Sequence, residues 1–403
     1  MADPRATAGT GEPAWPGFVA LWRDDALYAR TFDPADPANG AQIVSCDGVP
    51  IREFLLDRLE LYNFRPAEAG QWWTRPSQLF YAHAGVTRAQ PRSCTFLYAD
   101  SFEETRSLDW RALSRQEHTF RRDAMYGEAE PIALSEPREG IFFIGLQDFQ
   151  PDADAIADYE TLFEDVAARR KELLSAKALV LDLRNNQGGS SRWSERLAQL
   201  LWGESSLEAR RHVSPEVHWR NSRENILHME RVAARLRQEG DAQLASWVDR
   251  VTAGMRASSK RKKPLFAQSA IGAPAPDRTS NSAIGDPATD FAAPVYVITP
   301  GYCASACLDA LDLFTLYENV RLIGAPTSAD STYMDARVSD LSHGPGRVVI
   351  PIKVYVGRQR LWGEIYEPDI VMRDLDWSTQ SFLNRIERDL SGAEETTRVV
   401  SGR

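Results

Sequence analysis

The sequence lacks any run of about 18 to 20 apolar residues, the length that a membrane span requires. It also lacks a basic excess: 47 Lys and Arg stand against 57 Asp and Glu, which gives a formal charge of −10. The one basic run, SSKRKKP at residues 258–264, is short and predicts a solvated loop. We therefore expect a globular protein of 403 residues without a membrane span and without a nucleic-acid partner.

The start of the chain, MADPRATAGTGEPAWP, has no basic segment followed by an apolar one, so no secretory signal peptide is visible. This pattern leaves two hypotheses open. Either the protein is cytosolic, or its N-terminus has been removed.

Cysteine is sparse, and the pattern of the four cysteines excludes the usual zinc motifs. Cys46, Cys94, Cys303 and Cys307 form no CxxC pair and have no histidine at zinc-finger spacing. We therefore expect no metal site and no cofactor. Cys303 and Cys307 lie on either side of Ser305, which favours small packing residues over a disulfide framework.

Residues 1–125 predict a small mixed module. The segments GFVALW, ALYARTF and GAQIVSC alternate in the strand period, and an Asp-Gly turn leads into the helical run IREFLLDRL. RSCTFLYAD at residues 92–100 predicts a further strand. The polar stretch at residues 104–138 is expected to link this module to the next.

Residues 126–385 predict a layered α/β domain. The strand IFFIGL, the helical run YETLFEDVAARRKELLSA and the strand ALVLDL form a βαβ unit, and PVYVIT, VRLIGA and RVVIPIKVYV predict later strands. A helical insertion at about residues 203–258, broken near Gly240, is expected to cover the sheet. Residues 258–290 predict a flexible loop, and residues 386–403 a polar tail.

Two segments that follow apolar strands carry the candidate chemistry. In TPGYCASACLDAL, Ser305 stands at the expected start of a helix, where free amides and a positive helix end favour an anion, although an N-cap is the usual role of such a serine. In DLRNNQGGSS, Gly188 and Gly189 allow the backbone to approach a ligand closely. Both lie at carboxyl ends of strands, where α/β domains place their sites.

Together, DLRNNQGG, TPGYCASACLDAL and VRLIGAPTS resemble the tail-specific, or carboxyl-terminal processing, serine protease family, and GAQIVSCDGVPIREFL resembles its PDZ-like module. The resemblance covers about residues 18–372. It implies a crotonase/ClpP-like βαβ core preceded by that module, and peptide or protein substrates. It also implies Ser305 as the nucleophile, with the amides of Gly188 or Gly189 and of Ala306 as the oxyanion hole.

The sequence departs from the lysine-dependent members of this family, because Asp330 stands in GAPTSADSTYM where a lysine base is expected. The departure points to the branch with a Ser-His-Glu arrangement. In LWGEIYEPDIVM, Glu364 is the candidate that orients the histidine and Glu367 is the second candidate; a plain surface carboxylate is the alternative for either.

The histidine of that branch belongs to an Asp-x-His motif ahead of the PDZ-like module, and none stands there in this sequence. One hypothesis is that an upstream segment is missing; another is that the protein has lost its base. Within the chain, His83 in LFYAHAGVT is the best substitute, because it lies among small residues after a loop, while a structural role is the commoner one for a lone histidine.

The sequence thus predicts a serine endopeptidase, and the resemblance implies a periplasmic or secreted setting. The alternative is a catalytically impaired peptide- or ligand-binding protein on the same scaffold. Acyl chemistry of the crotonase type is a third and more remote possibility, since no acyl-CoA site is recognisable. The substrate preference and the oligomeric state do not follow from the sequence.

Overall fold

The computed structural model describes residues 12–60, 64–83, 90–211, 215–272, 291–343 and 346–392. The chain forms two compact units. The first comprises Met1–Leu197, Phe291–Ala329 and Ile365–Arg403, and the second comprises Ala198–Asp290 and Asp330–Glu364. No helix in the described ranges combines the length and the apolar character that a bilayer crossing needs.

The first unit begins with an antiparallel sheet. Its strands are β2 (Phe18–Arg23), β3 (Ala26–Thr31), β4 (Gln42–Cys46), β5 (Val49–Pro50), β6 (Ser93–Leu97) and β7 (Glu103–Ser107). The strand order is β2-β3-β4-β6-β7, and β5 pairs with β4. Asp47 and Gly48 have positive φ values of 50° and 77°, as a two-residue Asp-Gly hairpin turn requires. The predicted strands and turn are therefore confirmed.

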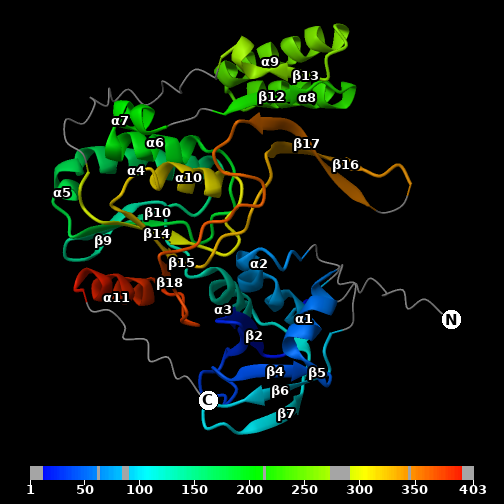
Figure 1. The fold of residues 1–403 in the computed structure, drawn as a ribbon, viewed down its shortest axis with the longest axis vertical. Helices are drawn as coiled ribbons and strands as arrows, with labels where there is room; N and C mark the ends of the chain where they lie inside the picture. The colour runs from blue at the N-terminus through cyan, green and yellow to red at the C-terminus, as the bar shows by residue number, and fades with distance from the viewer. Residues whose placement is uncertain are drawn as a thin grey trace. The chain divides into compact units, whose positions relative to one another are not determined.

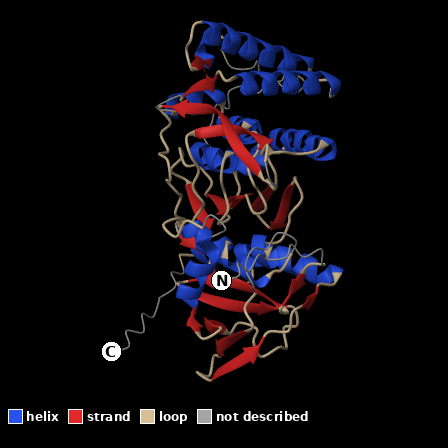
Figure 2. Ribbon diagram, turned by 90° about the vertical axis from the view of Figure 1, so that its right-hand side faces the viewer, coloured by secondary structure: helices blue, strands red, loops and turns tan. Residues whose placement is uncertain are grey.

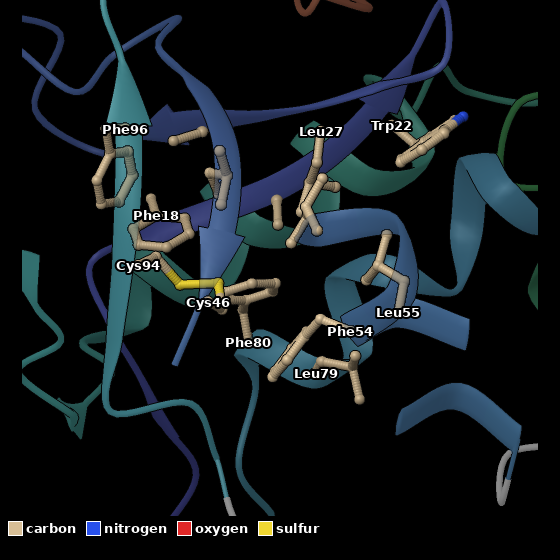
Figure 3. Close-up of a cluster of buried hydrophobic side chains, with 14 of the residues drawn as sticks. Phe18, Trp22, Leu27, Cys46, Phe54, Leu55, Leu79, Phe80, Cys94 and Phe96 are labelled. Atoms are coloured by element: carbon tan, nitrogen blue, oxygen red, sulfur yellow. A yellow bond between two sulfur atoms is a disulfide. The ribbon is translucent and has the colours of Figure 1, made fainter. Parts of the chain in front are cut away.

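One face of this sheet packs against three short helices: α1 (Ile51–Leu59), α2 (Ala69–Thr74) and the 3₁₀ helix η2 (Pro76–Phe80). Aromatic side chains such as Phe18, Phe80 and Phe96 fill the space between sheet and helices (Figure 3). Cys46 and Cys94 lie opposite each other on β4 and β6 within this core and form a disulfide, which we call the sheet disulfide. This bridge was not predicted from the sequence.

Residues 104–138 are more ordered than a polar link. They contain β8 (Arg111–Ala112), which pairs with β1 (Ala14–Trp15), then α3 (Arg115–Tyr126) and β9 (Leu134–Arg138). Ser114 caps α3: its hydroxyl accepts from the Glu117 amide, and the Glu117 carboxylate accepts from the Ser114 amide. This capping box, SRQE, was the sequence signal for the helix.

The centre of the first unit is a six-stranded sheet in the order β18-β15-β14-β11-β10-β9. Its remaining strands are β10 (Ile141–Gly145), β11 (Ala178–Asp182), β14 (Val295–Thr299), β15 (Val320–Gly324) and β18 (Ile370–Val371). All neighbours are parallel except β9 and β10. Because β11 and β14 are parallel neighbours, the loops that follow them leave the same edge of the sheet.

Helices connect these strands and cover the sheet, as the alternation in the sequence predicted (Figure 1). They are α4 (Ala153–Ala168), α5 (Arg170–Leu174), α6 (Arg192–Trp202), α10 (Ala306–Phe314) and α11 (Thr379–Leu390). The face of the sheet that carries Phe143, Val180 and Ile298 packs against Phe382 and Ile386 of α11. The architecture is mixed α/β.

The second unit has a sheet of its own, in the order β13-β12-β17-β16. Its elements are α7 (Glu204–Arg210), β12 (Glu216–Arg220), α8 (Arg223–Gln238), α9 (Ala242–Lys260), β13 (Leu265–Ala267), η3 (Gln268–Ala270), β16 (Tyr333–Asp340) and β17 (Arg347–Val356). Helices α8 and α9 form a hairpin, clear in Figures 1 and 2, which breaks near Gly240 as predicted.

Three predictions about this unit need correction. The strand RVVIPIKVYV is β17 and joins the antiparallel sheet of the second unit, not the parallel sheet, because it pairs with β12 and β16. The α8–α9 hairpin packs on that same sheet through Trp219, Met229 and Ile352. In the expected loop 258–290, residues 265–270 form β13 and η3, and residues 273–290 lie outside the described ranges.

Candidate active site

The turn between β14 and α10 holds Ser305 in an unusual backbone conformation. Ser305 has φ 58° and ψ −130°, a region that residues other than glycine rarely occupy. Such a conformation costs on the order of 1–3 kcal/mol and persists only where the surroundings enforce it, often at active sites. A serine on a strained turn from strand to helix is also the arrangement that presents the nucleophile in α/β-hydrolases.

Ser305 occupies the N-cap position of α10, but its side chain makes no capping hydrogen bond. The N-cap role that the sequence left open is therefore not what this hydroxyl does. The Ser305 carbonyl accepts from the Asp309 amide at 3.0 Å, which starts the helix. No described residue accepts a hydrogen bond from the Ala306 amide, the first of α10.

Gly188 lies directly against Ser305. It has φ 90° and is buried, and a Cβ placed on it would lie 2.9 Å from the Ala304 carbonyl oxygen, 3.1 Å from the Ser305 Cβ and 3.4 Å from the Ala306 nitrogen. Any side chain here would push the loop away from the serine. The structure thus brings together the two segments that the sequence singled out.

The two glycine amides differ in what they do. The Gly188 amide donates to Oδ1 of Asn186 at 2.9 Å. Gly189 is exposed, and no described residue accepts from its amide. Gly189 has a φ of 135° and packs closely against the Phe149 backbone, and the neighbouring Ser190 amide donates to the Phe149 carbonyl. These constraints fix the direction of the Gly189 amide.

The glycine loop is fixed at its base by a buried ion pair. Arg184 binds the Asp182 carboxylate through Nε at 2.9 Å and Nη2 at 2.8 Å, and both residues are fully buried. Arg184 also donates to the Trp377 carbonyl and to the Thr379 hydroxyl, both at 2.7 Å. Burial lowers the pKa of Arg184, but Asp182 more than offsets this and leaves the pKa above its ordinary value, so the Arg184 guanidinium stays charged.

Two further hydrogen bonds hold the loop in place. Asn186 Nδ2 donates to the Leu146 carbonyl at 2.6 Å. The Ser191 hydroxyl donates to the Asp309 carboxylate on α10 at 2.6 Å, so it ties the glycine loop to the helix of Ser305. These roles were not predicted from the sequence, although Asp182, Arg184 and Asn186 belong to the quoted DLRNN segment.

Cys303 and Cys307 form a second disulfide, which we call the elbow disulfide. Both cysteines are fully buried, and only Ala304, Ser305 and Ala306 lie between them. The prediction that they serve as separate packing residues was wrong. A covalent bridge therefore closes a short loop around the candidate nucleophile.

The N-terminal module contacts the turn that leads to Ser305. A Cβ on Gly70 of α2 would overlap the Thr327 backbone and lie 2.5 Å from the Gly301 carbonyl oxygen. The buried Glu68 carboxylate accepts from the Ala329 amide at 3.2 Å. The Gly70 contact thus supports the turn at Gly301, while Thr327 and Ala329 lie in the loop that follows β15.

Tyr302, the residue directly before the elbow disulfide, carries a phenol in a dry environment. Burial raises its pKa well above the ordinary value, so it remains protonated at neutral pH and cannot act as a base. Its ring packs edge-on against Tyr126 at 5.0 Å. Among the described residues, no group of three or more His, Cys, Asp or Glu side chains is arranged to hold a metal ion.

His83 belongs to the same compact unit as Ser305 and has an exposed side chain. The preceding residue, Ala82, bridges to Ala14, and the His83 ring lies 5.5 Å from the Tyr81 ring. Arg121 in turn stacks on Tyr81 at 3.7 Å. The backbone before His83 is thus held by tertiary contacts.

Glu364 is the last residue of the second unit, and Ile365 returns the chain to the first. The exposed Glu364 carboxylate accepts from the Leu361 amide at 2.7 Å. Glu367 is also exposed and belongs to the first unit. Asp330, at the position expected for a lysine, pairs with Arg360, so it is a partner of a cation and not a base.

The family of the chain follows from these residues and from the sequence around them. A family model of peptidase family S41 matches residues 143–371, which include the glycine loop, Ser305 and Glu364. The match covers more than half of the chain. The chain belongs to peptidase family S41 and is a serine peptidase whose substrates are peptides or proteins. The resemblance predicted from the motifs is confirmed at this level.

Solved structures of mature CPAF show a similar fold at low sequence identity. Mature CPAF matches with a TM-score of 0.58 and 13% identity, over 95% of this chain and 84% of that chain. Mature CPAF complexed with lactacystin gives 0.57 and 12%, over 95% and 84%. The photosystem II D1 C-terminal processing protease gives 0.33 and 15%, over 90% and 74%. No curated protein sequence is significantly similar to this chain.

Proposed function

We propose that the protein is a serine endopeptidase of the tail-specific type, with Ser305 as its nucleophile. The observation that carries this proposal is the positive-φ turn at Ser305, with the Gly188 backbone against it and the Ala306 amide beside it. Because the Ser305 side chain does not cap its own helix and its backbone is strained, we infer that its hydroxyl serves in catalysis.

The oxyanion donors that we propose are the amides of Gly189 and Ala306. The Gly188 amide already donates to Asn186, so Gly188 contributes by its lack of a side chain. As Ser305 Oγ attacks the peptide carbonyl carbon, the carbonyl oxygen gains negative charge and accepts from these two amides. The α10 N-terminus adds a favourable positive end.

We propose His83 as the general base. It takes the proton of Ser305 during attack and returns it to the leaving amine, after which water cleaves the acyl-enzyme. Support comes from its exposure and from its place in the same unit as Ser305. His118, an exposed histidine on α3 in that unit, provides a matched control. His83→Ala should abolish peptide hydrolysis, whereas His118→Ala should retain it.

Glu364 is our proposal for the carboxylate that orients the histidine, and its support is its position in the sequence. The matched pair of variants is Glu364→Gln and Glu367→Gln, which remove one negative charge three residues apart. We expect kcat to fall at least about 100-fold only for Glu364→Gln. Equal activity of the two variants would assign the orienting role elsewhere.

The N-terminal sheet, as a PDZ-like module, would bind an extended substrate segment by strand addition. The terminal strand β7 alternates exposed and half-buried residues and pairs only with β6 among the described strands, which suits this role. Two disulfides suit an oxidising compartment, so we also propose a periplasmic or secreted setting. The layered parallel sheet is consistent with the proposed crotonase/ClpP-like core.

The experiment that tests the proposal is labelling with a fluorophosphonate, followed by mass spectrometry of the modified peptide. The wild-type chain should be labelled at Ser305, and Ser305→Ala should not be labelled. The Ser246→Ala variant, which changes an exposed serine on α9 and keeps Ser305, controls for nonspecific serine modification. A folded wild-type chain that is never labelled would instead support a binding protein on a protease scaffold.

A further inference from the structure

We propose that the elbow disulfide, Cys303–Cys307, positions Ser305 for catalysis, so that activity depends on the redox state of this one bridge. The inference rests on the proposed role of Ser305 as nucleophile. It assigns Cys303 and Cys307 as positioning residues, since neither sulfur faces substrate: both are fully buried.

The bridge lies where the backbone is most constrained. It joins the turn after β14 to the second residue of α10, and the strained Ser305 is the middle residue of the three that it encloses. On one side, the Cys303 amide donates to the Pro300 carbonyl at 3.1 Å. On the other, the Cys307 amide donates to the Ala304 carbonyl at 3.2 Å. These local bonds and the bridge act on the same short segment.

The positive φ of Ser305 decides where its hydroxyl and the Ala306 amide point. With the bridge intact, residues 303 and 307 cannot move apart, and the intervening segment cannot extend. Without it, Ser305 can relax toward negative φ, which side chains prefer, and this rotates the hydroxyl and the amide relative to each other. A displacement of about 1 Å at a reacting group costs about 100-fold in rate.

Noncovalent contacts from outside the loop lie on both sides of Ser305. Gly188 lies beside the Ala304 carbonyl and the Ser305 Cβ without a side chain between them, and Ser191 binds Asp309 one turn further along α10. Gly301 packs against α2 before the loop begins. These contacts flank the strained residue but do not connect its two sides covalently.

Reduction of the bridge by a dithiol balances simply. Two electrons and two protons pass to the protein, the S–S bond breaks, Cys303 and Cys307 become thiols, and the dithiol closes to its own cyclic disulfide. Re-oxidation reverses each step. The sheet disulfide undergoes the same chemistry, so it serves as a control within the same chain.

The test compares two double variants of the full chain: Cys303→Ala/Cys307→Ala and Cys46→Ala/Cys94→Ala. Peptide hydrolysis and the rate of fluorophosphonate labelling are measured for both and for wild type. We expect kcat and the labelling rate to fall about 10- to 100-fold in the elbow variant, with KM changed less than about threefold. The sheet variant should keep kcat within about twofold. The pH dependence of kcat/KM should keep its apparent pKa values, because the base is untouched.

Equal activity of the elbow variant and wild type would overturn the inference, as would equal losses in the two variants. If a variant fails to fold, the wild-type chain is treated with dithiothreitol under native conditions, and thiol alkylation with mass spectrometry reports which bridge has opened. Activity should then fall with the fraction of reduced Cys303 and return on re-oxidation. Activity that is independent of this fraction contradicts the inference.

The failure of the inference and that of the proposed function are distinguishable. A wild-type chain that is labelled at Ser305, together with an elbow variant that is labelled equally fast, removes only the inference. A wild-type chain with both disulfides intact and no labelling at Ser305 removes the proposed function, and the inference falls with it.

Discussion

The two disulfides of this chain join pairs of buried cysteines, yet they connect very different kinds of backbone. The sheet disulfide links residues 48 apart in sequence that already face each other on the paired strands β4 and β6. The elbow disulfide links residues four apart, across a turn that contains a strained serine. One bridge closes a long loop around ordinary structure, and the other closes a short loop around the candidate nucleophile.

The difference separates two effects of a cross-link. Restricting the unfolded chain stabilises a protein more when the closed loop is long. The effect of a disulfide on local geometry does not grow with loop length. Its importance for activity depends on whether the residues it holds take part in catalysis. We therefore expect the sheet disulfide to matter more for stability and the elbow disulfide to matter more for catalysis.

The largest expected effect on stability comes from Cys46→Ala/Cys94→Ala. The loop-entropy relation gives a loss of about 4 kcal/mol for a loop of this length. The loss should appear as a lower midpoint in urea unfolding. The measurement is made under oxidising conditions, so that wild type keeps both disulfides and the variant keeps the elbow disulfide. A loss below about 1 kcal/mol would mean that β4 and β6 already associate in the unfolded chain. It would contradict the expectation that the sheet disulfide matters mainly for stability.

The next largest effect is expected where the site is constrained by a noncovalent contact, the packing of Gly189 against Phe149, and not by a disulfide. Gly189→Ala should cost about 3 kcal/mol, because its Cβ would overlap the Phe149 backbone at a φ of 135°. Activity should fall as well, since the Gly189 amide turns away from the oxyanion. Gly240→Ala, at a φ of 88° with no atom within 4 Å, is the control for positive φ alone. Equal costs for both variants would rule out the overlap as the cause.

The elbow variant Cys303→Ala/Cys307→Ala should lose only about 2 kcal/mol of stability, because its loop is short. This is about half of the loss expected for the sheet variant, and urea unfolding of the two measures the ratio. A larger loss in the elbow variant would show that this bridge also secures the packing of α10, so that stability and catalysis would no longer separate.

The smallest expected effect concerns pH. The Glu117 carboxyl, hydrogen-bonded to Arg111 and to the Ser114 cap, has its pKa lowered to about 2. A lowered folded-state pKa gives stability that is present above the ordinary value of about 4.5 and is lost as pH falls toward 2. We expect a loss of about 1–2 kcal/mol, since Arg111 is half exposed.

Glu117→Gln should remove this acid dependence, as measured by unfolding at pH 3 and pH 6. The Glu53→Gln variant, which alters an acidic side chain in the first turn of α1, is the control. A similar acid dependence in Glu117→Gln and wild type would contradict the assignment. The comparison of the two disulfides is therefore best made above pH 5.

Much of the fold could be predicted from the periodicity of the sequence. The strands β2, β10, β11 and β14 are short apolar runs, and α8 and α9 show helical periodicity with a glycine between them. The α3 helix was missed because its segment, RQEHTFRRDAMY, is mostly polar and its capping box was not used. The partner strands of β17 could not be predicted, since an apolar run looks the same in either sheet.

The sequence by itself determined which segments carry the chemistry: a serine between small residues after one strand, a glycine pair after another, and a family pattern that both belong to. Only the tertiary structure decided how they act. It placed Gly188 against Ser305, gave that serine a positive φ and joined the cysteines on either side of it. The physical reason is that periodicity reports local burial, whereas a strained backbone and a disulfide depend on contacts between distant segments.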